Sequence, residues 1–107
     1  MTRYDAVALT EFAREVFEKA GLASDRAQVC AEILVEGDLL GHTTHGLALL
    51  EAYTGELESG GMTADGDPLT ISDRIAAVAW DGRRLPGPWL TVKALELASE
   101  RARQAGT

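Results

Sequence analysis

Both histidines of the chain fall in one short segment, residues 38–46, which reads DLLGHTTHG. The segment combines one carboxylate, Asp38, with the imidazoles of His42 and His45 and the hydroxyl of Thr44. Histidine exchanges protons near neutral pH, so one of these rings could act as general acid or base toward a carbonyl or an alcohol. A neighbouring hydroxyl could orient the ring or the substrate. Proton transfer is therefore the first hypothesis for this segment.

Two other interpretations of the segment stay open. In a continuous helix, Asp38, His42 and His45 would lie at i, i+4 and i+7 on one face and would offer three ligands to a divalent metal. Gly41 weakens that helix, and the spacing matches no established metal motif, so we assign no metal ligand. In the plainest interpretation, both histidines are solvated loop residues.

Other common chemistries find little support in the sequence. The single cysteine, Cys30, excludes an internal disulfide and a multi-cysteine zinc site. It falls on an apolar stripe, where we expect a buried core residue rather than a reactive thiol. The chain has no G-x-G-x-x-G or G-x-S-x-G pattern, so neither a Rossmann dinucleotide site nor a nucleophile elbow is predicted.

Composition limits the possible partners. The chain has 107 residues with 10 Lys and Arg against 17 Asp and Glu, a net charge of −7, and 46% hydrophobic residues. These values are typical of one globular domain. No basic cluster would attract nucleic acid or an anionic membrane, and no apolar stretch approaches the ~20 residues of a membrane span. We expect no nucleic-acid or membrane partner and a cytoplasmic protein.

The segments around the histidines are predicted to be helical. Apolar spacing predicts a first helix over residues 7–20 with Gly21 as its C-terminal cap. Ser24 is expected to cap a second helix that fades over residues 37–41. Thr43 or Thr44 is expected to cap a third helix that ends at the glycine pair 60–61.

The remainder of the chain changes character. Residues 69–72 and 75–82 are predicted as two short strands, forming a hairpin or adjacent sheet strands. Pro88 suits the first turn of a helix over residues 89–105. The predicted fold is α+β, with three N-terminal helices, two short strands and one long C-terminal helix.

The run AEILVEGDLLGHTTHGLALLEAYTGELESGGM resembles the N-terminal signature of the malate/L-lactate dehydrogenase family of NAD(P)-dependent oxidoreductases. That signature has the form D-x-x-G-x-x-S-H-G, followed by a helix with an aromatic residue and a closing glycine. Downstream, AAVAWDGRRLPGPWLTVKALELASERARQAG is similar to the family's strand ending in Asp-Gly and its long helix. The residues of this chain that match the motif are Asp38, Gly41, Thr44, His45 and Gly46.

The resemblance implies a specific chemistry. His45 would be the acid/base in hydride exchange between NAD or NADP and a small 2-hydroxy or 2-oxo acid. Thr44 replaces the family's serine, keeps a hydroxyl and is expected to contact the substrate or the ring. His42 occupies a variable position and receives no role. The family binds its dinucleotide on a non-Rossmann fold and is typically dimeric, which implies a homodimer for the full-length form.

The chain also departs from the family pattern. An arginine that can pair with the substrate carboxylate is replaced by Leu49, and the glycine-rich stretch after Asp-Gly reads LPGPW. Family members are several times longer, so residues 1–107 are expected to be a partial domain that cannot catalyse alone. Residues 1–61 would form its helical segment, and residues 62–107 the start of the cofactor-binding region, with the cofactor-binding residues unknown. The alternative is a non-enzymatic helical interaction or oligomerisation module.

Overall fold

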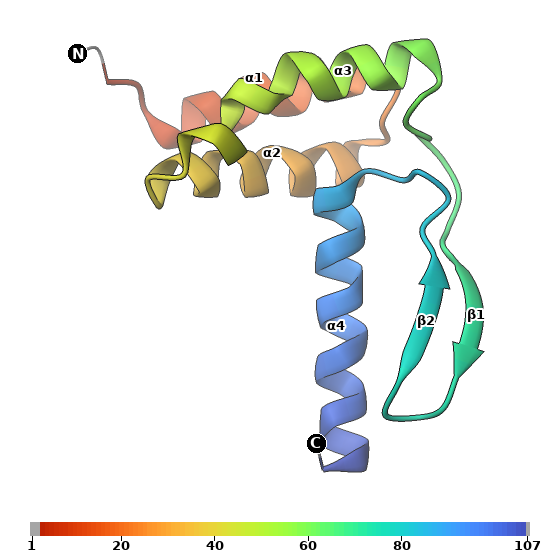
Figure 1. The fold of residues 1–107 in the computed structure, drawn as a ribbon. Helices are drawn as coiled ribbons and strands as arrows, with labels where there is room; N and C mark the ends of the chain where they lie inside the picture. Colours follow the sequence, from red (N-terminus) through yellow and green to blue (C-terminus); the bar gives the residue numbers. More distant parts are fainter. Residues whose placement is uncertain (1–2, 107) are drawn as a thin grey trace.

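The computed structural model describes residues 3–106. Its element order confirms the α+β prediction of three N-terminal helices, two short strands and a long C-terminal helix. Figure 1 shows α1, α2 and α3 lying alongside one another, with α4 leaving this helical layer at a steep angle beside the hairpin. The elements are α1 (Ala6–Lys19), α2 (Ser24–Leu39), the short 3-10 turns η1 (Thr43–His45) and η2 (Leu47–Leu49), α3 (Leu50–Ser59), β1 (Leu69–Asp73), β2 (Val78–Asp81) and α4 (Gly87–Ala105).

Local capping explains where α1 begins and ends. The Asp5 carboxylate accepts a hydrogen bond from the Ala8 N–H at 3.1 Å, which satisfies one of the free donors at the helix start. After the last turn, Gly21 adopts φ +116° and the Leu22 N–H reaches back to the Phe17 carbonyl at 3.1 Å. Glycine tolerates this backbone conformation, so the prediction that Gly21 ends the helix is confirmed.

The predicted cap of α2 was wrong by one residue. Ala23 occupies the N-cap position without a side-chain hydrogen bond, and Ser24 is the first helical residue. Ser24 instead acts with Arg14 on Glu18 at the end of α1, where both lower the pKa of that carboxyl. Helix α2 therefore begins without the side-chain cap that the sequence predicted.

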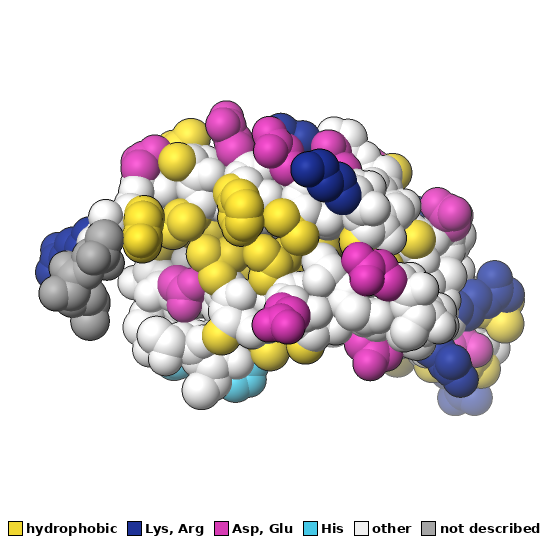
Figure 2. All heavy atoms as spheres, turned by 90° about the horizontal axis from the view of Figure 1, so that it is seen from above, with side chains coloured by type: hydrophobic (Ala, Val, Ile, Leu, Met, Phe, Trp, Pro, Cys, Tyr) yellow, Lys and Arg dark blue, Asp and Glu magenta, His cyan; other side chains and the backbone are white. Residues whose placement is uncertain are grey.

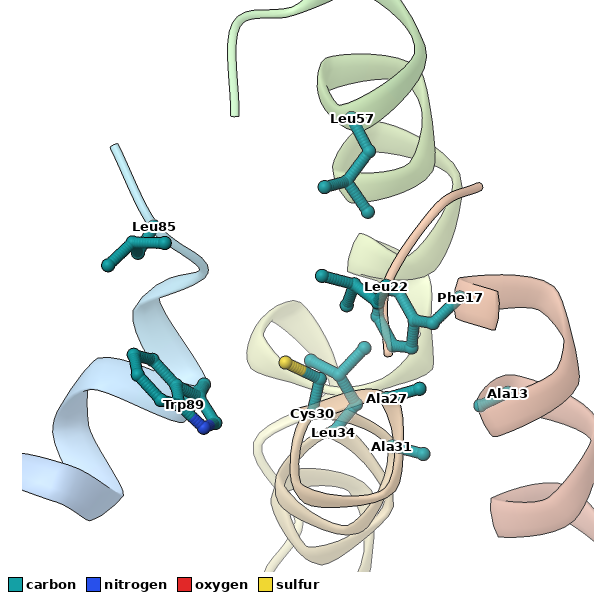
Figure 3. Close-up of a cluster of buried hydrophobic side chains, with 10 residues drawn as sticks. All are labelled: Ala13, Phe17, Leu22, Ala27, Cys30, Ala31, Leu34, Leu57, Leu85 and Trp89. Atoms are coloured by element: carbon teal, nitrogen blue, oxygen red, sulfur yellow. The ribbon is translucent and has the colours of Figure 1, made fainter. Parts of the chain in front are cut away.

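The core lies where α1, α2 and the start of α4 meet (Figure 3). Phe17 and Leu34 are 1% exposed, and Cys30 is fully buried among them, as predicted. Burial raises the pKa of the Cys30 thiol to about 11. The cluster comprises Ala13, Phe17, Leu22, Ala27, Cys30, Ala31, Leu34, Leu57, Leu85 and Trp89.

Helix α4 is anchored to this core by its first turn. Pro88 and Trp89 are its buried residues, and the prediction that Pro88 lies in the first turn of the helix is confirmed. The Arg26 guanidinium lies 3.9 Å from the centre of the Trp89 ring, a favourable cation–π arrangement. The rest of α4 extends beyond the helical layer and runs beside the hairpin (Figure 1).

The two strands form the predicted antiparallel hairpin, with Leu69 opposite Asp81 and Asp73 opposite Val78. The second strand is shorter than the predicted residues 75–82, because residues 74–77 form the turn, in which Ile75 has φ +66°. Arg101 of α4 links α4 to this turn by donating hydrogen bonds of 2.7 and 2.8 Å to the Asp73 carboxylate. Over residues 3–106, the structure contains no helix with both the length and the apolar character to cross a bilayer.

Candidate functional site

The histidine segment begins at the C-terminus of α2, which ends at Leu39. Gly41 follows with φ +84°, the His42 N–H bonds to the Gly37 carbonyl at 2.8 Å, and the Gly41 N–H bonds to the Asp38 carbonyl at 3.0 Å. This pair of bonds is the Schellman arrangement, in which glycine supplies the left-handed residue that turns the chain out of the helix. Gly41 therefore ends α2 and begins the loop of residues 40–47, called here the histidine loop.

The metal interpretation of this segment was wrong in its geometric premise. It required a helix through Asp38, His42 and His45, but α2 ends between the first and second of these residues. Within residues 3–106, no three His, Cys, Asp or Glu side chains lie together in a way that could hold a metal ion. The three residues therefore have separate environments.

The predicted cap of the third helix was also wrong. Thr43 and Thr44 lie in the single turn η1 and make no capping bond; a second turn, η2, follows, and α3 begins only at Leu50. The physical reason is the backbone of Gly46, whose φ of −108° and ψ of −145° interrupt the helix. The predicted end of the helix is confirmed, since Gly60 has φ +86°.

The structure assigns Asp38 a role that the sequence interpretation missed. Its carboxylate Oδ2 accepts a hydrogen bond from the Leu47 N–H at 2.9 Å, across the base of the histidine loop. A side chain at Gly46, which is buried, would collide with the same carboxylate. Asp38 thus holds the backbone directly after His45.

Gly37 is the second residue that sequence reasoning missed. It lies within α2, where a Cβ would come 2.5 Å from the His45 carbonyl oxygen and 3.1 Å from its carbon. Helix α2 can therefore approach the histidine loop closely only because residue 37 has no side chain. A glycine inside a helical pattern was the available signal, because such a glycine costs helix stability unless packing requires it.

His45 and Thr44 form a polar pair on the outside of this loop. The Thr44 hydroxyl lies 3.0 Å from His45 Nδ1, and both residues are exposed. A hydroxyl can donate to a bare Nδ1 or accept from a protonated Nδ1. Thr44 can therefore pair with Nδ1 in either state, and Nε2 takes no part in this contact.

His42 makes a different contribution. Its carbonyl accepts the His45 N–H at 2.9 Å, which closes the turn η1. Its ring is exposed and, within residues 3–106, has no hydrogen-bond partner. The two histidines are thus distinguished by their contacts, and only His45 is paired with a hydroxyl.

Comparison with known proteins places the chain in a family. The family model for malate/L-lactate dehydrogenase matches residues 4–107. Hydroxycarboxylate dehydrogenase B of Escherichia coli (strain K12) is 31% identical over 104 residues, covering 97% of this chain and 29% of the relative. L-sulfolactate dehydrogenase of Methanocaldococcus jannaschii is 29% identical over 92 residues, covering 86% of this chain and 27% of the relative.

Solved structures support the same assignment. The malate dehydrogenase of Pyrococcus horikoshii OT3 superposes with a TM-score of 0.94 at 27% identity, covering 98% of this chain and 30% of that one. A malate/lactate dehydrogenase-like protein from E. coli gives a TM-score of 0.90 at 30% identity, covering 97% and 29%. The chain belongs to the malate/L-lactate dehydrogenase family, and it spans less than a third of the length of the relatives it matches.

Proposed function

We propose that this chain supplies the proton-transfer residue of an NAD- or NADP-dependent dehydrogenase that interconverts small 2-hydroxy and 2-oxo acids. The observation that carries the proposal is the Thr44–His45 pair, with 3.0 Å between the hydroxyl and Nδ1 and the ring exposed. Family membership supports a hydroxy acid substrate. We propose a cytoplasmic homodimer for the full-length form.

His45 would exchange the proton and Thr44 would hold its ring. During reduction, the imidazolium donates a proton from Nε2 to the carbonyl oxygen of the 2-oxo acid; during oxidation, neutral imidazole removes the hydroxyl proton. A bound nicotinamide would supply or accept the hydride. The ring orientation suits this task, because Thr44 engages Nδ1 and leaves Nε2 for a substrate oxygen. We assign no residue of this chain to holding the dinucleotide.

Leu49 bears on which acid is used. It lies at the end of η2, partly buried and packed against the core cluster. An apolar side chain in this place cannot form an ion pair with a substrate carboxylate. We therefore propose that the carboxylate is bound by a group outside residues 3–106 or that the substrate is atypical for the family.

A second candidate function is a helical interaction or oligomerisation module. Figure 2 shows apolar side chains gathered on the face formed by α1 and α3. On α1, Val7 is 67% and Phe12 57% exposed, and such surface commonly marks a contact with another chain. An interaction module does not require the His45 ring. Only the dehydrogenase proposal therefore predicts that a substitution at His45 lowers turnover.

The test compares the two histidines in an active context. Residues 4–107 would replace the matching part of E. coli hydroxycarboxylate dehydrogenase B, and turnover of 2-oxo acids with NADH and NADPH would be followed by absorbance. We expect His45→Ala to lower kcat by about 10²- to 10⁴-fold. The matched control, His42→Ala, should leave kcat near the parent value because its ring has no partner within the described residues.

The pH dependence provides a second readout of the same role. Reduction needs the protonated ring and oxidation needs the neutral ring, so the rates in the two directions should change oppositely with pH. His45→Gln should remove this opposition. If His45→Ala and His42→Ala reduced kcat equally, or if neither did, the acid/base assignment would be refuted and the interaction module favoured.

A further inference from the structure

Asp38 lies in an electrostatically unfavourable position. It is in the last turn of α2, which contains no basic residue, and the C-terminus of a helix carries partial negative charge that disfavours a carboxylate. A carboxylate in this place needs a compensating donor. The donor is the Leu47 N–H, 2.9 Å from Oδ2 and nine residues further along the chain.

The same carboxylate also fills space. A Cβ at Gly46 would overlap the Asp38 carboxyl group, so the carboxylate occupies the volume that a side chain at residue 46 would take. Gly46 is buried between the exposed residues of η1 and the partly buried Leu47. The backbone after His45 is therefore held by one hydrogen bond and by direct packing against Asp38.

The backbone at His45 itself is held from the other side. The His45 carbonyl lies directly against α2 at Gly37, and the His45 N–H is bonded to the His42 carbonyl. With both peptide units of His45 restrained, the direction of its Cα–Cβ bond is restrained as well, and the contact of Nδ1 with the Thr44 hydroxyl then orients the exposed ring. Without Asp38, the hydrogen bond to the Leu47 N–H and the packing on Gly46 would be lost, while the contact of the His45 carbonyl with Gly37 and the His45 N–H bond would remain.

We propose that Asp38 is a positioning residue for His45, acting through the Gly46–Leu47 backbone rather than through contact with the ring. The effect of Asp38 on turnover rests on the proposed function of His45, whereas its effect on the Gly46–Leu47 backbone does not. Proton transfer depends on sub-ångström placement of the donor, and a misplacement of about 1 Å can lower a rate by 10²-fold. Asp38 would thus affect the reaction without touching substrate.

The structural test uses the 107-residue chain and hydrogen exchange followed by NMR. Asp38→Ala removes the acceptor, and we expect the Leu47 amide to exchange at least about tenfold faster. Asp38→Asn keeps an oxygen at the same distance, so exchange should stay within about threefold of the parent chain. The control is Asp65→Asn, which removes the same charge at an exposed loop position. If the alanine variant does not fold, Asp38→Ser, whose hydroxyl is too short to reach Leu47, replaces it.

The functional test uses the E. coli chimaera. We expect Asp38→Ala to lower kcat by about 10- to 100-fold with KM retained, and Asp38→Asn to recover most of the loss. Unchanged Leu47 exchange in Asp38→Ala, or equal effects of Asp38→Ala and Asp65→Asn on kcat, would overturn the proposal. If His45→Ala keeps full turnover, the proposed function fails, and Leu47 exchange alone then decides whether Asp38 holds the loop.

Discussion

Gly37 and Gly55 allow the packing of the histidine loop to be measured against a matched control. Both glycines lie inside helices, α2 and α3 respectively. A Cβ at Gly55 would have no atom within 4 Å, whereas a Cβ at Gly37 would lie 2.5 Å from the His45 carbonyl oxygen. Alanine at the two positions therefore has the same helical preference but a different steric consequence.

The expected magnitudes follow from these distances. Replacing a helical glycine with alanine stabilises the folded state by about 0.5–1 kcal/mol, and Gly55→Ala should show this gain. At Gly37 the same gain is opposed by overpacking against backbone, which costs about 1–3 kcal/mol. We expect Gly37→Ala to lower the free energy of unfolding by about 1 kcal/mol, equivalent to a fall in Tm of about 4–8 °C.

Two measurements on the isolated chain would check this reasoning. Urea denaturation gives the difference in unfolding free energy between each variant and the parent chain. Amide chemical shifts show where the structure moves, and we expect changes over residues 43–47 for Gly37→Ala but not for Gly55→Ala. A Gly37→Ala variant as stable as Gly55→Ala, with unchanged shifts in the histidine loop, would refute the close approach of α2 to His45.

Two further predictions concern the hairpin and the core. Arg101 holds the pKa of Asp73 at about 2, below its ordinary value of 3.8, so the ion pair should stabilise the hairpin turn above about pH 4 and lose that effect as the pH falls toward 2. Asp73→Asn should abolish the change in amide exchange of the turn between pH 4 and pH 2, while the control Asp65→Asn should retain it. If amide exchange of the turn depended on pH equally in the parent chain and in Asp73→Asn, the stabilising role of the Arg101–Asp73 pair would be contradicted. Burial raises the pKa of the Cys30 thiol to about 11, so iodoacetamide should label the native chain far more slowly at pH 8 than the chain in guanidinium chloride. Comparable labelling rates in the two conditions would show that Cys30 is accessible.

Elements with a strong local signal were predictable. Gly21 ends α1 with a positive φ, and Gly60 does the same at the end of α3. The apolar stripe of α2 placed Cys30 in the core. These features depend on a few neighbouring residues, and their physical cause is therefore contained in a short stretch of sequence.

Features that depend on contacts across the chain were not predictable in the same way. Thr43 and Thr44 are good capping residues, but Gly46 packs against Asp38, and the Asp38–Leu47 hydrogen bond fixes two short turns in place of a longer helix. Contacts with α2 therefore outweighed the local capping preference of the two threonines.

The sequence by itself determined the family frame, the helical and hairpin elements, and His45 beside a hydroxyl at residue 44. Only the tertiary structure showed the different environments of Asp38, His42 and His45, because these depend on where α2 ends and how the following loop folds back onto it. In a continuous helix the three residues would share one face, whereas the left-handed Gly41 places them in different environments. The physical reason is that one residue with positive φ redirects all of the chain after it.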